Sequence, residues 1–417
     1  MSEWREVELG DLGAVVTGTT PPAERPEWFG DSLPFITPSD IAPPDRRARP
    51  DRSLSEDGRI ALQRRLLPPG SVCFVCIGAT IGKLCLTDIE SVTNQQINSV
   101  VSNDSNDGRF LYYLLRHEAP RIASTAGGAA TPLINKTSFS HITVRVPDKR
   151  TQQAISAVLS RLDDLIEHNR RRFEILEKMA RAIYREWFVH FRHPGHERDS
   201  LVDSEVGPIP NGWSLGTLGD VAELDRTGIQ PSKFADERFD HYSIPAFDEG
   251  ALPAIAEGSS IKSGKYVLST PAVLVSKLNP RIERTWFVEP AQERRAVTST
   301  EFLILRPRPR STLEHLYLAS CSEPFQGRLR ELSGGTSTSH QRAKPTDFIR
   351  LRVVCPPLEL VERLTEITRP MLALARTLRS QSRDVLLLRD HLLPKLVTGA
   401  IDVSSLDFDP LVESSVA

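Results

Sequence analysis

A glycine-rich run between two apolar segments has the first spacing that suggests chemistry. Gly78-Ala79-Thr80-Ile81-Gly82-Lys83 is close to a loop that cradles nucleotide phosphates. Such a loop has four residues between its glycines and a serine or threonine after the lysine, whereas this run has three and is followed by Leu84. We therefore interpret it as a glycine turn joining two strands, with approach of Lys83 to a DNA phosphate as the alternative.

Two other groups consist of residue types that bind metals. One is Cys73, Cys76 and Cys85, and the other is His190, His193 and His196. The cysteines match only the first half of a zinc pattern, since no second pair follows at a suitable spacing. Residues three apart in a strand face opposite ways, so buried free thiols are the preferred interpretation. The histidines stand beside a Pro-Gly turn, and a solvated linker explains them better than a metal site.

The remaining catalytic patterns are weak. Asn279-Pro280-Arg281 resembles the start of the Asn-Pro-Pro-aromatic motif of amino-methyltransferases, but the aromatic residue is missing. No glycine fingerprint follows a strand to hold S-adenosylmethionine. No Ser/His/Asp set or carboxylate pair stands out. The sequence therefore predicts a chain without catalytic activity and without a cofactor of its own.

A long helix is the element around which the chain is organised. From Gln152 to Phe191 apolar residues recur in heptads, and charged residues fill the positions between them, which is typical of a helix with one apolar seam. The polar seam residue Asn169 is of the kind that fixes register in coiled coils. Position a holds Leu159, Ile166, Phe173, Ala180 and Trp187, and position d holds Ile155, Leu162, Asn169, Leu176 and Ile183.

An internal repeat indicates what this helix connects. Trp4 and Asp11 recur as Trp213 and Asp220, and both offsets equal 209 (213 − 4 and 220 − 11). Adding 209 to the heptad positions gives the residues of a second amphipathic segment. Its d row is Leu364, Met371, Leu378, Val385 and Leu392, and its a row is Thr368, Ala375, Ser382, Arg389 and Leu396. The chain is thus predicted to contain two copies of a mixed domain followed by a long helix.

The predicted segments are a first domain at 1–149, a central helix at 150–192, a linker with the second domain at 193–355, a distal helix at 356–401 and a tail at 402–417. Apolar runs bounded by turn residues predict strands, and runs without apolar periodicity predict loops. Pro370 should kink the distal helix or delay its start. The expected strands include 33–36, 71–77, 141–146 and 272–276, and the expected loops include 42–57 and 119–137.

Bulk properties exclude few function classes. At 417 residues, the chain is long enough for two or three domains. It has no apolar run of membrane-spanning length and no signal peptide. Five cysteines favour a reducing compartment, so we expect a cytoplasmic protein. The net charge of −2 is weak evidence against DNA binding, although local clustering of charge decides that question.

Several runs resemble the specificity subunit of type I restriction-modification enzymes, over nearly the whole chain. Gly207-Pro208-Ile209-Pro210-Asn211-Gly212-Trp213 is similar to the start of a target-recognition domain, and 392–401 is similar to the end of the distal helix. The runs 78–83 and 94–98 are similar to parts of the recognition domains. In the second domain, Lys277-Leu278-Asn279-Pro280-Arg281 replaces the glycine run, a departure that bears on sequence preference.

The resemblance implies an α+β fold with two target-recognition domains and two helices paired in an antiparallel coiled coil about a pseudo-two-fold axis. Each domain would read one half of a split, asymmetric target in double-stranded DNA. The helices would set the number of unspecified base pairs between the halves. The partners would be two modification subunits, which methylate adenine, and two restriction (motor-nuclease) subunits. S-adenosylmethionine, ATP and Mg²⁺ would bind to these partners. A scaffold that holds two copies of a partner without reading DNA is the alternative.

Candidate DNA-contacting residues follow from the chemistry of base and phosphate recognition. Base edges are read by Arg, Lys, Asn and Gln, whereas short hydroxyls and loop amides bind phosphates. For each candidate, an ordinary solvated surface role is the competing interpretation. The candidates are Lys83, Thr131, Asn135 and Lys136 in the first domain, and Lys277, Asn279, Arg281, Arg284, Gln341, Arg342 and Lys344 in the second.

Overall fold

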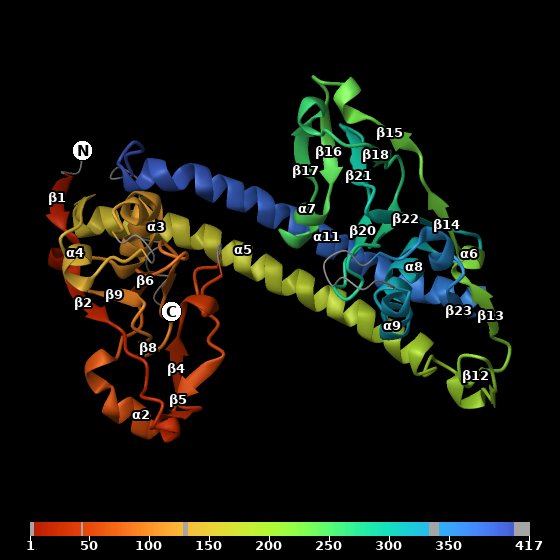
Figure 1. Cartoon of the computed structure of the whole chain (residues 1–417), viewed down its shortest axis with the longest axis horizontal. Coiled ribbons are helices and arrows are strands. Elements are labelled where there is room, and N and C mark those ends of the chain that lie inside the picture. Colours follow the sequence, from red (N-terminus) through yellow and green to blue (C-terminus); the bar gives the residue numbers. More distant parts are fainter. Residues whose placement is uncertain (1–3, 43–44, 128–131, 333–341, 404–417) are drawn as a thin grey trace. The chain divides into compact units, whose positions relative to one another are not determined.

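The chain forms two compact units, and each contains part of both long helices. The computed structural model describes residues 4–42, 45–127, 132–332 and 342–403. Unit 1 combines Met1–His168 with Gln381–Ala417, and unit 2 is Asn169–Ser380 (Figure 1). Helix α5 (Lys149–Tyr184) and helix α11 (Leu358–Val397) each begin in one unit and end in the other.

The central sheet of unit 1 has four strands in the order β2-β9-β6-β7, all antiparallel. A second sheet has the order β3-β5-β4-β8, and β1 pairs with β10. The bounds are β1 Arg5–Glu8, β2 Gly13–Thr17, β3 Phe29–Gly30, β4 Leu33–Ile36, β5 Arg52–Leu54, β6 Val72–Val75, β7 Leu84–Leu86, β8 Val92–Thr93, β9 Ile97–Ser102 and β10 Thr143–Val146.

Strand β6 is apolar throughout because both faces of its sheet are covered. Side chains alternate along a strand, so Val72 and Phe74 join the core built with helix α3 (Gly108–Ser124). Cys73 and Val75 join a second cluster on the other face. The short helices of unit 1 are α1 (Leu9–Leu12), α2 (Glu56–Ala61) and α4 (Lys136–Ser140).

The beginning of α5 and the end of α11 belong to the core of unit 1. Ile155 and Leu159 of α5 lie in the same apolar cluster as Leu393 and Leu396 of α11. Beyond α11, Gly399 has φ +76° and sits so close to Trp4 that an added Cβ would lie 2.7 Å from its indole ring. A side chain at this position would clash with the ring, so glycine allows α11 to end against the first residues of unit 1.

Unit 2 contains a four-stranded sheet of order β14-β22-β19-β20 and a five-stranded sheet of order β15-β18-β21-β16-β17. Strand β13 pairs with β23, and β11 pairs with β12. The bounds are β11 Leu201–Val202, β12 Ile209–Pro210, β13 Ser214–Thr217, β14 Ala222–Asp225, β15 Gly228–Ile229, β16 Arg238–Tyr242, β17 Ala254–Glu257, β18 Lys265–Val267, β19 Ala272–Ser276, β20 Thr285–Val288, β21 Arg295–Ser299, β22 Phe302–Pro307 and β23 Arg352–Cys355.

Apolar side chains cover both faces of β19 as well. Val273 and Val275 face a core that includes helix α8 (Leu313–Ser320), whereas Leu274 faces a cluster around Trp286. After α5, a π-helical segment at Arg185–Val189 places Trp187 and Phe188 in the core that includes α8. The other helices of unit 2 are α6 (Leu218–Val221), α7 (Ile244–Asp248), α9 (Glu323–Glu331) and α10 (Pro345–Phe348).

A buried histidine makes unit 2 sensitive to acid. His315 packs against Tyr184 and Phe188, and burial lowers its pKa from 6.5 to about 4. The unfolded chain therefore binds a proton as the pH falls below about 6.5, while the folded chain stays neutral until about pH 4. We expect unit 2 to lose ~2 kcal/mol of stability between pH 7 and pH 5 from this group. This loss of stability between pH 7 and pH 5 should be absent in the variant His315→Phe.

Urea unfolding at pH 7 and pH 5 measures this difference. The control is His141→Phe, which alters a side chain that is 64% exposed. An unfolding free energy whose pH dependence is the same in wild type and His315→Phe would contradict the assignment.

The predicted mixed α/β content and both long helices are confirmed. The strands expected at 33–36 and 272–276 are β4 and β19, and those expected at 71–77 and 141–146 are present with shorter bounds. No seam residue of the first heptad series is exposed. No helix of the described residues is long and apolar enough to cross a membrane.

Two local predictions were wrong. The segment 42–57 is not only a loop, because it contains β5, which pairs with β4 and β3. The segment 119–137 begins within α3, whose apolar residues Ala119 and Ile122 are buried in the core. Tertiary packing outweighs local preference in both cases. Of the two effects expected of Pro370, a delayed start is absent, because α11 starts at Leu358 and continues past the proline to Val397.

Candidate nucleic-acid interface

In unit 1 the glycine run and the candidate residues near 135 form one structure, here called loop pair 1 (residues 76–83 and 132–136). Gly78 N–H donates to the carbonyl of Pro132 at 2.9 Å, and Ile134 N–H donates to the carbonyl of Cys76 at 2.9 Å. Ile77 and Leu133 form an isolated antiparallel bridge. Two loops far apart in the sequence are thereby held side by side.

The glycine run is a turn between two strands, as the preferred interpretation predicted. It connects β6 to β7, and Gly78 and Gly82 have φ of +85° and +96°, which favour glycine. Lys83 follows the turn with a partly exposed side chain. Its carbonyl accepts a hydrogen bond from Val75 N–H at 2.8 Å, so the backbone of the turn is well fixed.

The other candidates of unit 1 lie at the start of α4. Asn135 is the N-cap residue, and its Oδ1 accepts from Ser138 N–H at 2.8 Å. This role occupies the Asn135 oxygen but leaves its amide group for another partner. Lys136 is exposed and has no ion-pair partner within the part of the chain that the structure describes. Thr131 lies outside the described residues.

Unit 2 has a corresponding arrangement, here called loop pair 2 (residues 277–284 and 342–344). Leu278 and Arg342 form an isolated antiparallel bridge, and Ala343 N–H donates to the carbonyl of Lys277 at 3.1 Å. The first of these loops connects β19 to β20, and the second precedes α10. The structure thus brings together candidates of unit 2 that are more than 50 residues apart in the sequence.

Asn279 is the unusual residue of loop pair 2. Its φ of +48° lies in the left-handed region, which asparagine tolerates better than most residues. Its Oδ1 is buried without a hydrogen-bond partner among the described residues. A buried acceptor without a donor is costly, and this oxygen must become exposed before a DNA base can reach it.

Ion pairs divide the cationic candidates into two classes. Arg284 forms a bidentate pair with Asp248, with Nε–Oδ1 and Nη2–Oδ2 distances of 2.7 and 2.8 Å. Arg342 binds both carboxylate oxygens of Glu301 at 3.1 and 2.9 Å. These two arginines must leave a carboxylate before they can bind DNA, and we regard them as structural. Among the described residues, Lys277, Arg281 and Lys344 have no such partner, and Gln341 lies outside that set.

The cysteines of the first domain are buried free thiols, as predicted. Cys73 and Cys85 lie opposite each other on β6 and β7, and burial raises the pKa of Cys76 to about 11. At neutral pH, Cys76 is therefore a protonated thiol, which is a poor metal ligand. Of the three linker histidines, His193 lies within 2.8 Å of Asp199 and stacks on Trp213.

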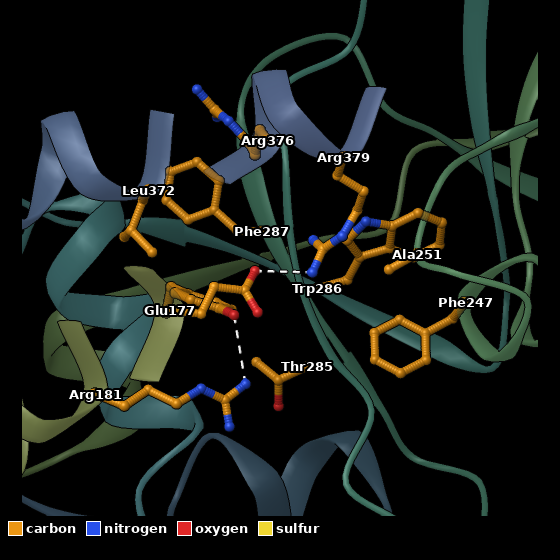
Figure 2. A pocket seen from close by; sticks show the side chains of 11 residues that line it. Glu177, Arg181, Phe247, Ala251, Thr285, Trp286, Phe287, Leu372, Arg376 and Arg379 are labelled. Atoms are coloured by element: carbon orange, nitrogen blue, oxygen red, sulfur yellow. Dashed lines mark hydrogen bonds and ion pairs between the residues drawn. The ribbon is translucent and has the colours of Figure 1, made fainter. Parts of the chain in front are cut away.

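The two long helices contact each other in each unit. In unit 1, Arg389 Nη1 of α11 lies 2.7 Å from Asp163 Oδ1 of α5. In unit 2, Arg379 Nη2 of α11 lies 3.0 Å from Glu177 Oε1 of α5, and its guanidinium lies over the ring of Phe173. Figure 2 shows the pair of Arg379 and Glu177 beside a small cavity of about 70 Å³.

The arginines that line this cavity are paired with carboxylates. Arg181 pairs with Glu283 at 2.8 Å, and its Nη2 donates to the Tyr317 hydroxyl at 3.4 Å. Arg376 pairs with Glu289 and lies over the ring of Phe287. These contacts join both helices to the β20 region of unit 2, so the cavity belongs to the junction between domain and helices.

Comparison with known proteins shows a similarity to one family. The family model described as the type I restriction modification DNA specificity domain matches residues 1–178. The MjaIX specificity subunit of Methanocaldococcus jannaschii is 24% identical across 97% of this chain and 95% of its own length. The chain is therefore similar to the type I restriction enzyme specificity subunits over nearly its whole length. The HindI specificity subunit of Haemophilus influenzae is 32% identical over 40% of this chain and 38% of that protein.

A solved structure has the same fold as this chain. The crystal structure of the S subunit of a type I restriction-modification system from M. genitalium covers 95% of this chain and 96% of that chain. Its TM-score is 0.63 and the sequence identity is 14%. The mixed α/β fold is therefore common to both proteins even though few residues are identical.

Sequence reasoning missed the residues that attach the rest of unit 1 to the long helices. Arg46 Nη2 lies 2.6 Å from Asp164 Oδ1, and Arg47 Nη1 lies 3.9 Å from Glu167 Oε1. Tyr113 of α3 donates to Asp163 at 2.6 Å. One signal was present in the sequence, because Arg389 occupies an a position of the second heptad series, where a charge is unexpected.

Proposed function

We propose that this chain is a specificity subunit that reads a split, asymmetric DNA target through loop pairs 1 and 2, one for each half. The observation that supports this reading is the recurrence of one arrangement. In each unit a loop between two central strands pairs with the segment before a short helix, and unpaired cations occur on both. Lysines there suit phosphates, and Asn279 and Arg281 have the groups that read adenine and guanine edges.

An internal duplication with a pseudo-two-fold axis is part of the proposal. Strands β1 and β13 begin 209 residues apart (214 − 5), and so do α5 and α11 (358 − 149). Strand β1 pairs with β10, which comes just before α5, and β13 pairs with β23, which comes just before α11. The two halves of the chain therefore have the same order of elements. The segments 1–149 and 193–355 are then two recognition domains, followed by helices at 150–192 and 356–401.

An antiparallel coiled coil of α5 and α11 is supported within each unit. In unit 1, Ile155 near the start of α5 shares a cluster with Leu396 near the end of α11, whereas Asp163 pairs with the earlier residue Arg389. In unit 2, Ala180 of α5 shares a cluster with Leu372 of α11, and Glu177 pairs with the later residue Arg379. The residue numbers run in opposite directions, as antiparallel helices require.

The helices also have surfaces suited to partner subunits. Leu165, Leu387 and Leu388 in unit 1 are large apolar side chains in contact with solvent, and Ile175, Met179 and Leu374 are the counterparts in unit 2. Both long helices thus carry exposed apolar side chains that a partner protein could cover. We assign these surfaces to two modification subunits, with two restriction subunits completing the complex. S-adenosylmethionine, ATP and Mg²⁺ would act on those partners, and this chain would be non-catalytic and cytoplasmic.

Binding of the complex to DNA should depend on the unpaired lysines of loop pair 2. Each phosphate contact releases counterions and contributes ~0.9 to the slope of log K against log salt. In a complex with the modification subunit, Lys277→Ala with Lys344→Ala should reduce that slope by ~2 and weaken binding at low salt. Fluorescence anisotropy over a salt series measures both quantities.

The matched control is Lys262→Ala, which removes an exposed lysine of the same unit outside the loop pair. An unchanged slope in the double variant would remove loop pair 2 from the DNA interface. If the wild-type complex binds no duplex even at low salt, the scaffold alternative replaces the DNA-reading function.

A further inference from the structure

A charged side chain is buried where α11 meets the first recognition domain. Arg389 is 1% exposed and Asp163 is 7% exposed. Their Nη1 and Oδ1 atoms lie 2.7 Å apart. Full charges are almost never buried without a partner, because the loss of hydration is costly. Each of these two charges therefore compensates part of the cost of burying the other.

A third element completes the site. The hydroxyl of Tyr113, a fully buried residue of α3, donates to Asp163 Oδ2 at 2.6 Å. Burial raises the pKa of Tyr113, and the charge of Asp163 raises it further, so the phenol remains a donor. One carboxylate of α5 thus binds α11 through one oxygen and the recognition domain through the other.

The guanidinium has a fixed direction. Nε and Nη2 of Arg389 both donate to Asp390 Oδ1, at 3.0 and 2.6 Å. Nη1 is then the nitrogen that points to Asp163. The contact among Tyr113, Asp163 and Arg389 therefore forms at one position of α11 along α5. The seam residues Leu159 and Leu396 are aliphatic and would pack in more than one register. A buried polar contact selects one register where apolar contacts select weakly.

We propose that Tyr113, Asp163 and Arg389 act as a register lock that determines which spacing between target halves is accepted. They are positioning residues, and the inference rests on the proposed function. A slip of α11 by one turn moves it about 5.4 Å along α5 and separates the buried charges. That distance exceeds the rise of one base pair, about 3.4 Å. Without the lock, the complex would accept targets with a longer or shorter spacer.

Methyl transfer to duplexes that differ only in spacer length tests the lock. The complex of this chain with its modification subunit is given the native target and targets one and two base pairs longer or shorter. In Asp163→Leu with Arg389→Met, the apolar pair keeps the helices together without charge. We expect the ratio of native to altered-spacer rates to fall at least tenfold.

The matched controls are Arg383→Met and Asp384→Asn, a neighbouring pair of α11 whose atoms lie 3.7 Å apart and whose aspartate is 68% exposed. They should preserve the wild-type ratio.

Two outcomes separate the inferences. An unchanged spacer ratio in the apolar double variant overturns the lock and leaves the DNA-reading function intact. A wild-type complex that methylates no split target instead overturns the proposed function itself.

Discussion

Inserting four residues into each long helix is expected to move the two target halves apart by about two base pairs. The insertions belong after His168 in α5 and after Ser380 in α11, at the boundaries of the two units. Four residues add ~6 Å to a helix, which is close to two base-pair rises. An insertion of four is absorbed in coiled coils by local unwinding, so the seam should persist.

Each recognition domain keeps its own loop pair in this variant, so both half-sites should remain readable. Methylation should therefore vanish at the native spacing and appear at the longer one. The measurement is sequencing of methylated adenines in DNA exposed to the variant complex. Insertion of the same four residues into the linker after Asp203 is the control and should leave the spacing unchanged. A motif of unaltered length in the helix variant would show that the helices do not measure the spacing.

Replacing Arg389 by methionine is expected to destabilise unit 1 by ~3–5 kcal/mol. The substitution leaves Asp163 buried with only the Tyr113 hydroxyl to replace its hydration. A buried carboxylate that loses its cation costs far more than an exposed one, for which the effect is ~0–1 kcal/mol. Denaturant unfolding of the full chain measures the loss.

Two variants separate the lost ion pair from the lost packing. Arg383→Met makes the same chemical change at a partly exposed site of α11 and should alter stability by less than ~0.5 kcal/mol. Adding Asp163→Leu to Arg389→Met removes the orphan charge and should recover most of the stability. If Arg389→Met unfolds within ~1 kcal/mol of wild type, the ion pair is not a structural element.

The sequence predicted the long helices well because their signal is periodic and local. Heptads over 40 residues determine both the element and its buried face, and no seam residue of α5 is exposed. The strand β5 was missed because a three-residue strand in a Pro- and Arg-rich segment has no periodic signal. Its existence depends on pairing with β4, which is a tertiary contact.

The candidate site was predictable as residue types and not as an arrangement. Nothing local in the sequence pairs Leu278 with Arg342, because that bridge depends on the sheet that supports both loops. The same limit applies to Arg284, whose charge suggested DNA although Asp248 neutralises it. Residue type indicates what a side chain can bind, and only the fold shows which partner is already present.

The most direct test of the central claim is a map of methylated adenines in the DNA of a host. One culture expresses this chain with the modification subunit, and a second expresses the modification subunit alone. We predict a new split motif, with two specified halves and a fixed gap, only when this chain is present. Identical methylation in both cultures, with the two proteins shown to associate, would contradict the claim that the chain reads DNA.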